Sequence, residues 1–339
     1  MITESIFFLF VLDLLAFFSI YSILNLSLNV QYGFTGVPNF GLVFCVAGGA
    51  FTVGFLSTRL AAWIFSIDIS GLNIIDDNLI IVSKINAVIA SQPFYGILLL
   101  IVVLVFAAVV GAMLGTLFSL PAVRLREDYL GITFLAFGEI LNVIGIAYRD
   151  LVGGPPGVNV PDVWAWASGW RFAASTLTIV FIAALIFAYS EYLIRTPFGR
   201  VLRAVRDNEV AAAAFGKDVA RYRLAAIIIG SMIASITGAL YALYSACVTP
   251  TFVRFHWTFL PWLMVLLGGV GNNLGVVMGT AVFYTIYKLI IYYKFALAGV
   301  VPFDVVWLNY ILIGIAVILV LIFRPQGLIP EKPKKMEQT

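Results

Sequence analysis

Charged residues are scarce in this chain. Lysine, arginine, aspartate and glutamate make up 11% of its 339 residues, whereas hydrophobic residues make up 62%. Soluble domains carry about 25% charged residues and about 45–50% apolar ones. The composition therefore excludes a soluble globular protein and predicts an integral membrane protein in contact with lipid. The net charge of +3 is too small to indicate nucleic-acid binding, so no nucleic-acid partner is expected.

Cysteine and histidine are almost missing as well. The chain has only Cys45, Cys247 and His256, which excludes a metal site built from His and Cys ligands, and we expect no cofactor. Both cysteines stand among apolar residues, where a cysteine behaves as a small buried hydrophobe. No Ser/His, Cys/His or clustered carboxylate arrangement indicates an enzyme. The pattern G-x-x-x-x-G-K-[ST] is absent, so the sequence contains no phosphate-binding loop of that type.

No lysine or arginine precedes Arg59, so the positively charged start of a signal peptide is missing, and we interpret the first apolar run as a membrane helix. We predict an all-α integral membrane protein, a polytopic helical bundle of about eight to ten transmembrane helices with interrupted or re-entrant segments. It forms a single domain over residues 1–330, with a cytoplasmic tail at 331–339. The runs long enough to span are Ser5–Val30, Leu42–Thr58, Phe94–Leu120, Tyr129–Tyr148, Ala173–Ile194, Leu224–Val248, Leu274–Tyr293 and Val305–Phe323.

Two segments leave the number of crossings open. Trp257–Val270 is short for a full crossing, so it is either a tilted span or a re-entrant half-helix. Ala61–Gln92 is either an amphipathic surface segment or hides another crossing, which would place the N-terminus inside. Basic loops mark the cytoplasmic side, and about nine crossings would place the N-terminus outside, the C-terminus inside and the loop 149–172 outside. This orientation depends on Arg124, Arg126, Arg195–Arg223, Arg324, Lys332, Lys334 and Lys335.

The stretch Arg195–Arg223 is conspicuously charged. Thr196-Pro197 is typical of a helix start, and one helix is expected to continue to Phe215 and to end at Gly216. One interpretation is an interfacial helix beneath lipid headgroups. The mixed signs favour a docking surface for a soluble protein instead, because a lipid-binding face would be more uniformly basic. The charged residues are Arg195, Arg200, Arg203, Arg206, Asp207, Glu209, Lys217, Asp218, Arg221 and Arg223.

Several motifs occur in a characteristic order along the chain. They are Leu125–Ile132 with Gly138-Glu139-Ile140, Gly153–Gly157, Gly199–Ala212 followed by Gly216, Leu267–Gly271, and Arg324–Leu328. Together they resemble branched-chain amino acid ABC transporter permeases, and they are more similar to the LivM-type subunit than to its LivH-type partner. The resemblance covers most of the chain, and the motifs are specific as a set.

This resemblance implies one half of a membrane pore, completed by a second permease of the LivH type. Two cytoplasmic ABC ATPase subunits, which would carry ATP and Mg²⁺, are expected on the charged loop 195–223. An extracytoplasmic solute-binding protein is expected to deliver branched-chain amino acids or, alternatively, urea or short amides, across a prokaryotic plasma membrane. The implied ATPase-coupling residues are Gly199, Arg200, Arg203, Arg206, Asp207, Glu209, Ala212 and Gly216. The implied residues facing the binding protein are Gly153, Gly154, Pro155 and Gly157.

Two glycine-rich interruptions are candidates for the translocation path. We call Gly33–Gly41 the first glycine segment and Gly268–Gly275 the second. Irregular backbone at membrane depth is tolerated where it is buried in protein or lines water, and paired interruptions point to a transport path. Ordinary interfacial turns are the alternative. The first segment departs from the commoner family pattern, in which a serine and a histidine stand nearby. The candidates are Gly33, Gly36, Pro38, Asn39, Gly41, Gly268, Gly269 and Gly271.

Two carboxylates lie in the middle of predicted spans. Glu139 is either part of the path or bonded to a neighbouring helix, and we interpret Asp13 as structural. A second function class, an ion-coupled secondary transporter, would use both as proton or sodium sites. Such a carrier needs no ATPase-docking loop, so the charged stretch favours the ABC importer.

Overall fold

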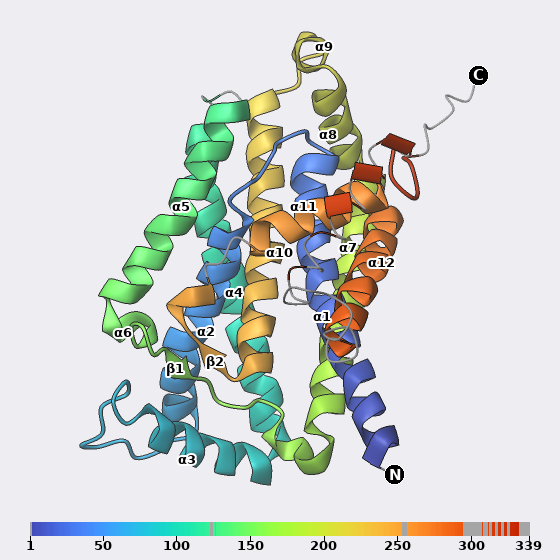
Figure 1. Ribbon diagram of the computed structural model, residues 1–339. Coiled ribbons are helices and arrows are strands. Elements are labelled where there is room, and N and C mark those ends of the chain that lie inside the picture. Colours follow the sequence, from blue (N-terminus) through green and yellow to red (C-terminus); the bar gives the residue numbers. More distant parts are fainter. Residues whose placement is uncertain are drawn as a thin grey trace.

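The computed structural model describes residues 2–122, 125, 127–252, 256–293, 307, 311, 314–315, 318–319, 322–323 and 326–331. Seven helices in this part of the chain are long and apolar enough to cross a membrane. They form one bundle (Figure 1), which confirms the predicted all-α polytopic membrane fold. The helices are α1 (Ile2–Leu28), α2 (Leu42–Ile64), α4 (Pro93–Ala122), α5 (Glu127–Ala147), α7 (Arg171–Arg195), α10 (Val219–Ser245) and α12 (Asn273–Tyr292).

Some sequence predictions lie mainly or wholly outside the described residues. These are the span Val305–Phe323, the tail 331–339 after Glu331, and the basic residues Arg124, Arg126, Arg324, Lys332, Lys334 and Lys335.

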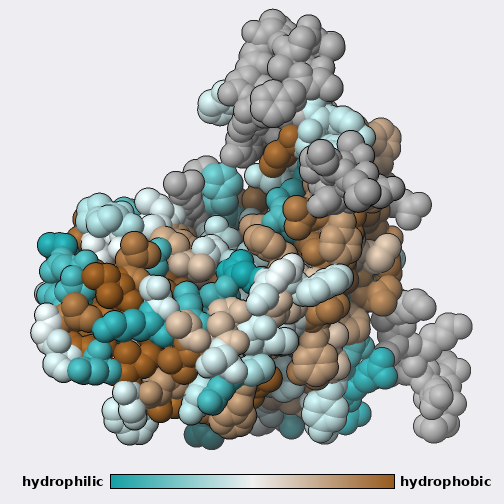
Figure 2. Space-filling view, turned by 90° about the horizontal axis from the view of Figure 1, so that it is seen from below, coloured by the Kyte–Doolittle hydropathy of each residue, from teal (hydrophilic) through white to brown (hydrophobic). Residues whose placement is uncertain are grey.

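Short elements gather at one end of the bundle (Figure 1). The helix α3 (Asn78–Ser91) has 14 residues, about 21 Å, which is too short to cross a bilayer. It contacts the neighbouring short elements, so Ala61–Gln92 adds no crossing. Hydrophilic and hydrophobic residues are mixed over this end (Figure 2). The other short elements here are α6 (Arg149–Val152), β1 (Val158–Asn159), β2 (Cys247–Val248), and the 3₁₀ helices η2 (Ala165–Trp170) and η3 (Pro250–Phe252).

The strands β1 and β2 form a small antiparallel pair, with Val158 opposite Val248. An all-α prediction does not include this pair. Each strand has two residues, too few for an alternating pattern to be visible in the sequence.

The helix α10 packs against both α2 and α4 in the centre of the bundle. Glycines allow this close approach: a Cβ atom at Gly238 would overlap the carbonyl oxygen of Val46, and one at Gly49 would overlap that of Ser235. Close backbone contact is a main source of attraction between helices in lipid. The opposite side of α4 carries exposed apolar residues at every fourth position, which fits a lipid-facing surface: Ile97, Ile101, Val105, Val109 and Met113.

The chain between α10 and α12 does not form one continuous long helix. The chain leaves α10 beside β2 and returns to the other end at Asn273, yet the only long helix described between them is α11 (His256–Gly268). Its 13 residues span about 20 Å. The helix α11 is therefore too short to lead from one end of the bundle to the other by itself (Figure 1). The first glycine segment interrupts the bundle in a similar way, after the π-helix η1 (Asn29–Gly33) that ends α1.

The charged loop and the Gly-Gly-Pro turn lie at opposite ends of the molecule. The helices α8 (Pro197–Asp207) and α9 (Glu209–Ala214) cap one end, and the turn that leads into β1 lies towards the other, as does the start of α1 (Figure 1). The segment Gln326–Glu331 lies against α8 through Glu331. The start of α1 and the segment Gln326–Glu331 therefore lie at opposite ends of the molecule, and which end faces the cytoplasm stays a prediction.

Candidate functional site

The charged loop forms two helices, and the prediction of one continuous helix is wrong. Asn208 has an extended backbone (φ −160°, ψ 105°) that ends α8, and its side chain accepts a hydrogen bond from the Ala211 amide at 2.9 Å. Asparagine is among the best N-cap residues, so it stabilises a new helix start rather than a helix interior. The predicted end at Gly216 is confirmed by its left-handed φ of +75°.

The two helices have an inner and an outer face. Leu202, Val205 and Ala212 are buried against the bundle, and a Cβ atom at Gly199 would overlap the end of α7. The outer face carries the exposed Arg200, Asp207 and Glu209. Two large apolar side chains also point into solvent: Val210 is 80% exposed and Phe215 is 84% exposed. An exposed apolar pair with a charged rim is typical of a docking surface.

Arg203 and Arg206 point from α8 into the protein. Arg206 donates a hydrogen bond of 2.5 Å to the carbonyl oxygen of Gly33 and forms an ion pair of 2.9 Å with Glu331. Arg203 lies 3.4 Å from the other carboxylate oxygen of Glu331. Partial burial acts to lower the pKa of Arg206, but Glu331 and Asp207 outweigh it and raise this pKa above its ordinary value. Arg206 therefore keeps its positive charge at physiological pH.

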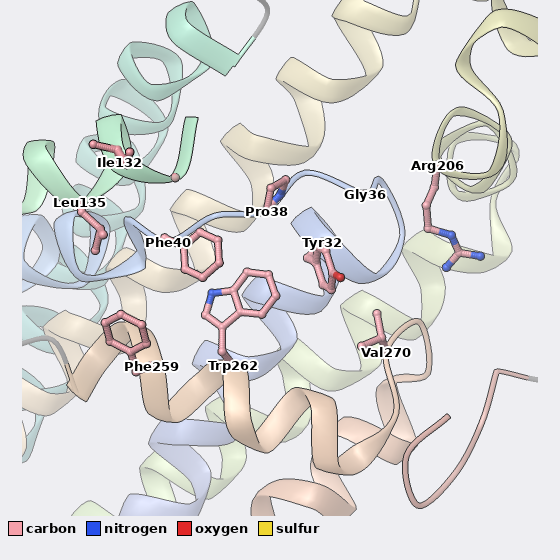
Figure 3. A pocket seen from close by; sticks show the side chains of 11 residues that line it. Tyr32, Gly36, Pro38, Phe40, Ile132, Leu135, Arg206, Phe259, Trp262 and Val270 are labelled. Carbon is pink, nitrogen blue, oxygen red and sulfur yellow. The ribbon is translucent and has the colours of Figure 1, made fainter. Parts of the chain in front are cut away.

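A pocket of about 980 Å³ opens beside Arg206 (Figure 3). Its walls come from five parts of the chain: the first glycine segment with Tyr32 of η1, α5, α8, α11, and Val270 of the second glycine segment. Most of the lining side chains are apolar or aromatic, and Arg206 supplies the charge. The lining residues are Tyr32, Gly36, Pro38, Phe40, Gly131, Ile132, Leu135, Arg206, Phe259, Trp262 and Val270.

Buried polar groups hold the first glycine segment in this shape. The indole of Trp262 donates to the carbonyl oxygen of Asn39 at 3.2 Å, and the Asn39 amide donates to Gln31 at 2.7 Å. The Asn39 side chain also accepts from the Gly41 amide at 2.7 Å. Because polar groups are costly to bury without partners, these bonds stabilise non-helical backbone inside the bundle. Gly36 and Pro38 thus line the pocket, whereas Gly33, Asn39 and Gly41 lie behind its wall.

The second glycine segment is covered by the end of the described chain. The amides of Leu328 and Ile329 donate to the carbonyl oxygens of Leu267 and Gly268, at 2.9 and 3.0 Å. Gly269, at φ +116°, lies directly beneath Ile329, where a side chain would not fit. Gly268, Gly269 and Gly271 are therefore not part of the pocket wall, and Val270 is the residue of this segment that reaches it.

The two mid-span carboxylates, Glu139 and Asp13, have different bonding partners. Glu139 is exposed on the face of α5 that carries Ile132 and Leu135, and it accepts a hydrogen bond of 3.0 Å from Asn142 of the same helix. The described bond is thus not to a neighbouring helix. Asp13 pairs with Lys288 of α12 at 2.5 Å and accepts from Tyr244 of α10 at 3.3 Å. This pairing agrees with the structural interpretation of Asp13.

The Gly-Gly-Pro turn depends on its glycines. Gly153, Gly154 and Gly157 have φ values of +76°, +69° and +79°, a region that side chains other than glycine rarely adopt. Pro155 is exposed at the tip. The backbone conformation of the turn is sufficient to explain why glycine occupies these three positions. A contact between this turn and a binding protein stays a prediction.

Sequence reasoning missed several residues of the site. The aromatic wall of Tyr32, Phe40 and Trp262 comes from two distant segments, and Phe40 stacks on Trp262 with ring centres 4.7 Å apart. The aromatic run Trp257–Trp262, next to a glycine interruption, was the available signal. Glu331 was assigned to a tail, and no pattern around it indicates that it pairs with α8.

Comparison with known proteins places these features in a family context. A family model described as "Branched-chain amino acid transport system / permease component" matches residues 10–321. The chain is 42% identical to the probable branched-chain amino acid transport permease protein LivM of Methanocaldococcus jannaschii, over 94% of this chain and 93% of that protein. The high-affinity branched-chain amino acid transport system permease protein LivM of Salmonella typhimurium is 26% identical, over 94% of this chain and 69% of its own.

A more distant similarity covers less of the chain. The nucleoside ABC transporter permease protein NupC of Lactococcus lactis is 26% identical over 41% of this chain and 47% of its own. No solved structure matches the chain significantly.

Proposed function

The chain belongs to the family of branched-chain amino acid transport permeases, and on this premise we propose that its pocket is part of the path for branched-chain amino acids through an ABC importer. The chain is a membrane-embedded transport subunit rather than an enzyme. The observation that carries the proposal is the pocket itself, in which the first glycine segment, α11 and Arg206 of the charged loop meet.

The wall chemistry supports an aliphatic solute. Ile132, Leu135 and Phe259 offer apolar surface to a leucine, isoleucine or valine side chain, whose burial is favourable by about 1.5–3 kcal/mol. Urea or a short amide would lose hydrogen bonds to water along the same wall without gaining apolar contact. The names of the two LivM relatives point in the same direction.

The loop end of the molecule fits an ATP-driven mechanism. The exposed Val210 and Phe215 form an apolar tip that would enter a cleft of a cytoplasmic ABC ATPase, which supplies ATP and Mg²⁺. An ion-coupled carrier would use both Asp13 and Glu139 as ion sites, yet Asp13 is paired with Lys288, which leaves Glu139 alone for this role. The family assignment also favours the ABC importer.

Further partners complete the proposed assembly. A LivH-type permease would close the pathway along α5, where Ile132 is 67% exposed and Glu139 is exposed on the same face. An extracytoplasmic solute-binding protein would dock at the opposite end, near the Gly153–Gly157 turn. The assembly would lie in a prokaryotic plasma membrane, with α8 and α9 on the cytoplasmic side.

The proposal is tested by narrowing the pocket. In proteoliposomes that contain the complete transporter and its binding protein, Leu135→Trp should lower ATP-driven leucine uptake about tenfold, because the indole would occupy space that the solute needs. A tenfold lower rate corresponds to a barrier higher by about 1.4 kcal/mol. Ile101→Trp places the same ring on the lipid-facing side of α4, outside the pocket, and should leave uptake unchanged. Excess isoleucine or valine should compete with leucine, whereas urea and nucleosides should not. Equal uptake by both tryptophan variants would contradict a path through this pocket.

A further inference from the structure

Arg206 connects parts of the chain that are far apart in sequence. Its guanidinium bonds to Gly33 at the end of η1, 173 residues away, and to Glu331 at the end of the described chain. Only 24% of its side chain is exposed, so these bonds are partly shielded from water. Charge-assisted hydrogen bonds are about twice as strong as neutral ones, and partial burial reduces screening by salt. The helix α8 is therefore bonded directly to the first glycine segment.

Residues Gln326–Glu331, which we call the strap, make the second connection. The strap covers the second glycine segment with the two backbone hydrogen bonds to Leu267 and Gly268. The Asn272 side-chain amide donates to the carbonyl oxygens of Ile329 and Pro330, at 3.4 and 3.3 Å. A Cβ atom at Gly327 would overlap the backbone of Gly269, so the two chains lie in close contact. The strap thus follows any movement of the turn between α11 and α12.

Glu331 joins the strap to α8. It is the strap residue that contacts both Arg203 and Arg206. The two glycine segments are themselves linked, because the Asn29 side chain accepts from the Gly271 amide at 2.9 Å and donates to Asn273 at 2.8 Å. The contacts therefore form a ring: α8 bonds to Gly33 of η1, Asn29 of η1 bonds to the second glycine segment, that segment bonds to the strap, and the strap pairs with α8.

We propose that Glu331 is a positioning residue for transport, and that the strap makes α8 and both glycine segments move as one body when ATPase subunits displace α8. This inference rests on the proposed function, since it assigns the route by which movement of the docking loop reaches the pocket. Coupling through discrete bonded elements is the physical requirement for such transmission. Without Glu331 the two guanidiniums of α8 lose their shared counter-charge and the strap loses its ion pairs to that helix.

The test compares uptake with ATP hydrolysis in the complete transporter in proteoliposomes. Glu331→Gln should lower the number of leucine molecules transported per ATP hydrolysed about tenfold, which is within the usual range for coupling between two sites. ATP hydrolysis by this variant should still respond to the loaded binding protein. Glu331→Asp keeps the charge and should restore most of this ratio. Arg203→Gln removes one of the two ion pairs from the α8 side and should lower the ratio part of the way.

Glu191→Gln is the matched control. Glu191 and Glu331 line the same small pocket, but Glu191 bonds to Asn273 and Arg195, not to α8. Its glutamine variant keeps an acceptor for Asn273 and should keep the wild-type ratio. An equal loss in Glu191→Gln, an unchanged ratio in both Glu331→Gln and Arg203→Gln, or a parallel loss of hydrolysis and uptake would each overturn the inference. Absence of ATP-driven uptake by the wild type would instead contradict the proposed function.

Discussion

Replacing Phe215 by aspartate should release the ATPase subunits from the permease and abolish ATP-driven uptake. The Phe215 ring is 84% exposed at the tip of the charged loop, and docking would bury it. Burial of such a side chain contributes about 1.5–3 kcal/mol, and a buried unpaired carboxylate adds a further penalty of at least about 1 kcal/mol. The two effects together predict that ATPase affinity falls about 100-fold or more. Co-purification in mild detergent and titration with isolated ATPase measure this loss.

Phe215→Leu is the control for this change. Leucine keeps an apolar tip, so the variant should retain most of the binding and uptake. Both substitutions are at an exposed position, where the expected change in the free energy of unfolding is within about 0.5 kcal/mol. Full ATPase binding by Phe215→Asp would show that the loop tip does not dock.

Replacing Gly238 by leucine should leave little folded protein in the membrane. This glycine brings α10 against α2, and a Cβ atom would overlap the carbonyl oxygen of Val46. Because the obstacle is backbone, the two helices have to separate, which predicts a loss of about 3 kcal/mol or more in the free energy of unfolding. That is a large share of the about 5–15 kcal/mol that stabilises a typical protein. The yield of monodisperse protein and its thermal unfolding midpoint in detergent report this loss.

Gly169→Leu is the matched change at an open position. No atom lies within 4 Å of a Cβ atom built there, so the variant should behave like the wild type. A Gly238→Leu protein with the wild-type unfolding midpoint would mean that α10 and α2 do not pack through Gly238.

The membrane helices were predictable from the sequence because the apolar character that lipid requires extends over about 20 consecutive residues in each of them. Apolar length and the near absence of charge located the helices that became α1, α2, α4, α5, α7, α10 and α12. The end of one helix and the start of the next were harder to predict, because a capping side chain competes there with continuation of the helix. Asn208 divides the loop helix because its side chain caps α9, although the alanines that follow it favour helix. The β1–β2 pair joins residues about 90 positions apart, and neither strand has a pattern of its own.

The candidate site was predictable only in part, because the sequence shows where the backbone is irregular but not which distant segments contact it. Glycine and proline marked Gly36 and Pro38 as irregular backbone, and these residues line the pocket. Gly268 and Gly269 carry the same signal, but the strap covers them, and this contact depends on tertiary structure. The charge of the loop was visible in the sequence, whereas the inward direction of Arg203 and Arg206 follows from their partner Glu331.

The most direct measurement is the reactivity of single cysteines in intact cells. Lys217→Cys would report on the charged loop and Pro155→Cys on the Gly-Gly-Pro turn, in a chain whose Cys45 and Cys247 are replaced by alanine. A membrane-impermeant maleimide should label Cys at 155 in intact cells, and should label Cys at 217 only after the membrane is opened. Labelling at 217 in intact cells would place α8 and α9 outside, where no ATPase can reach them, and would contradict the importer mechanism.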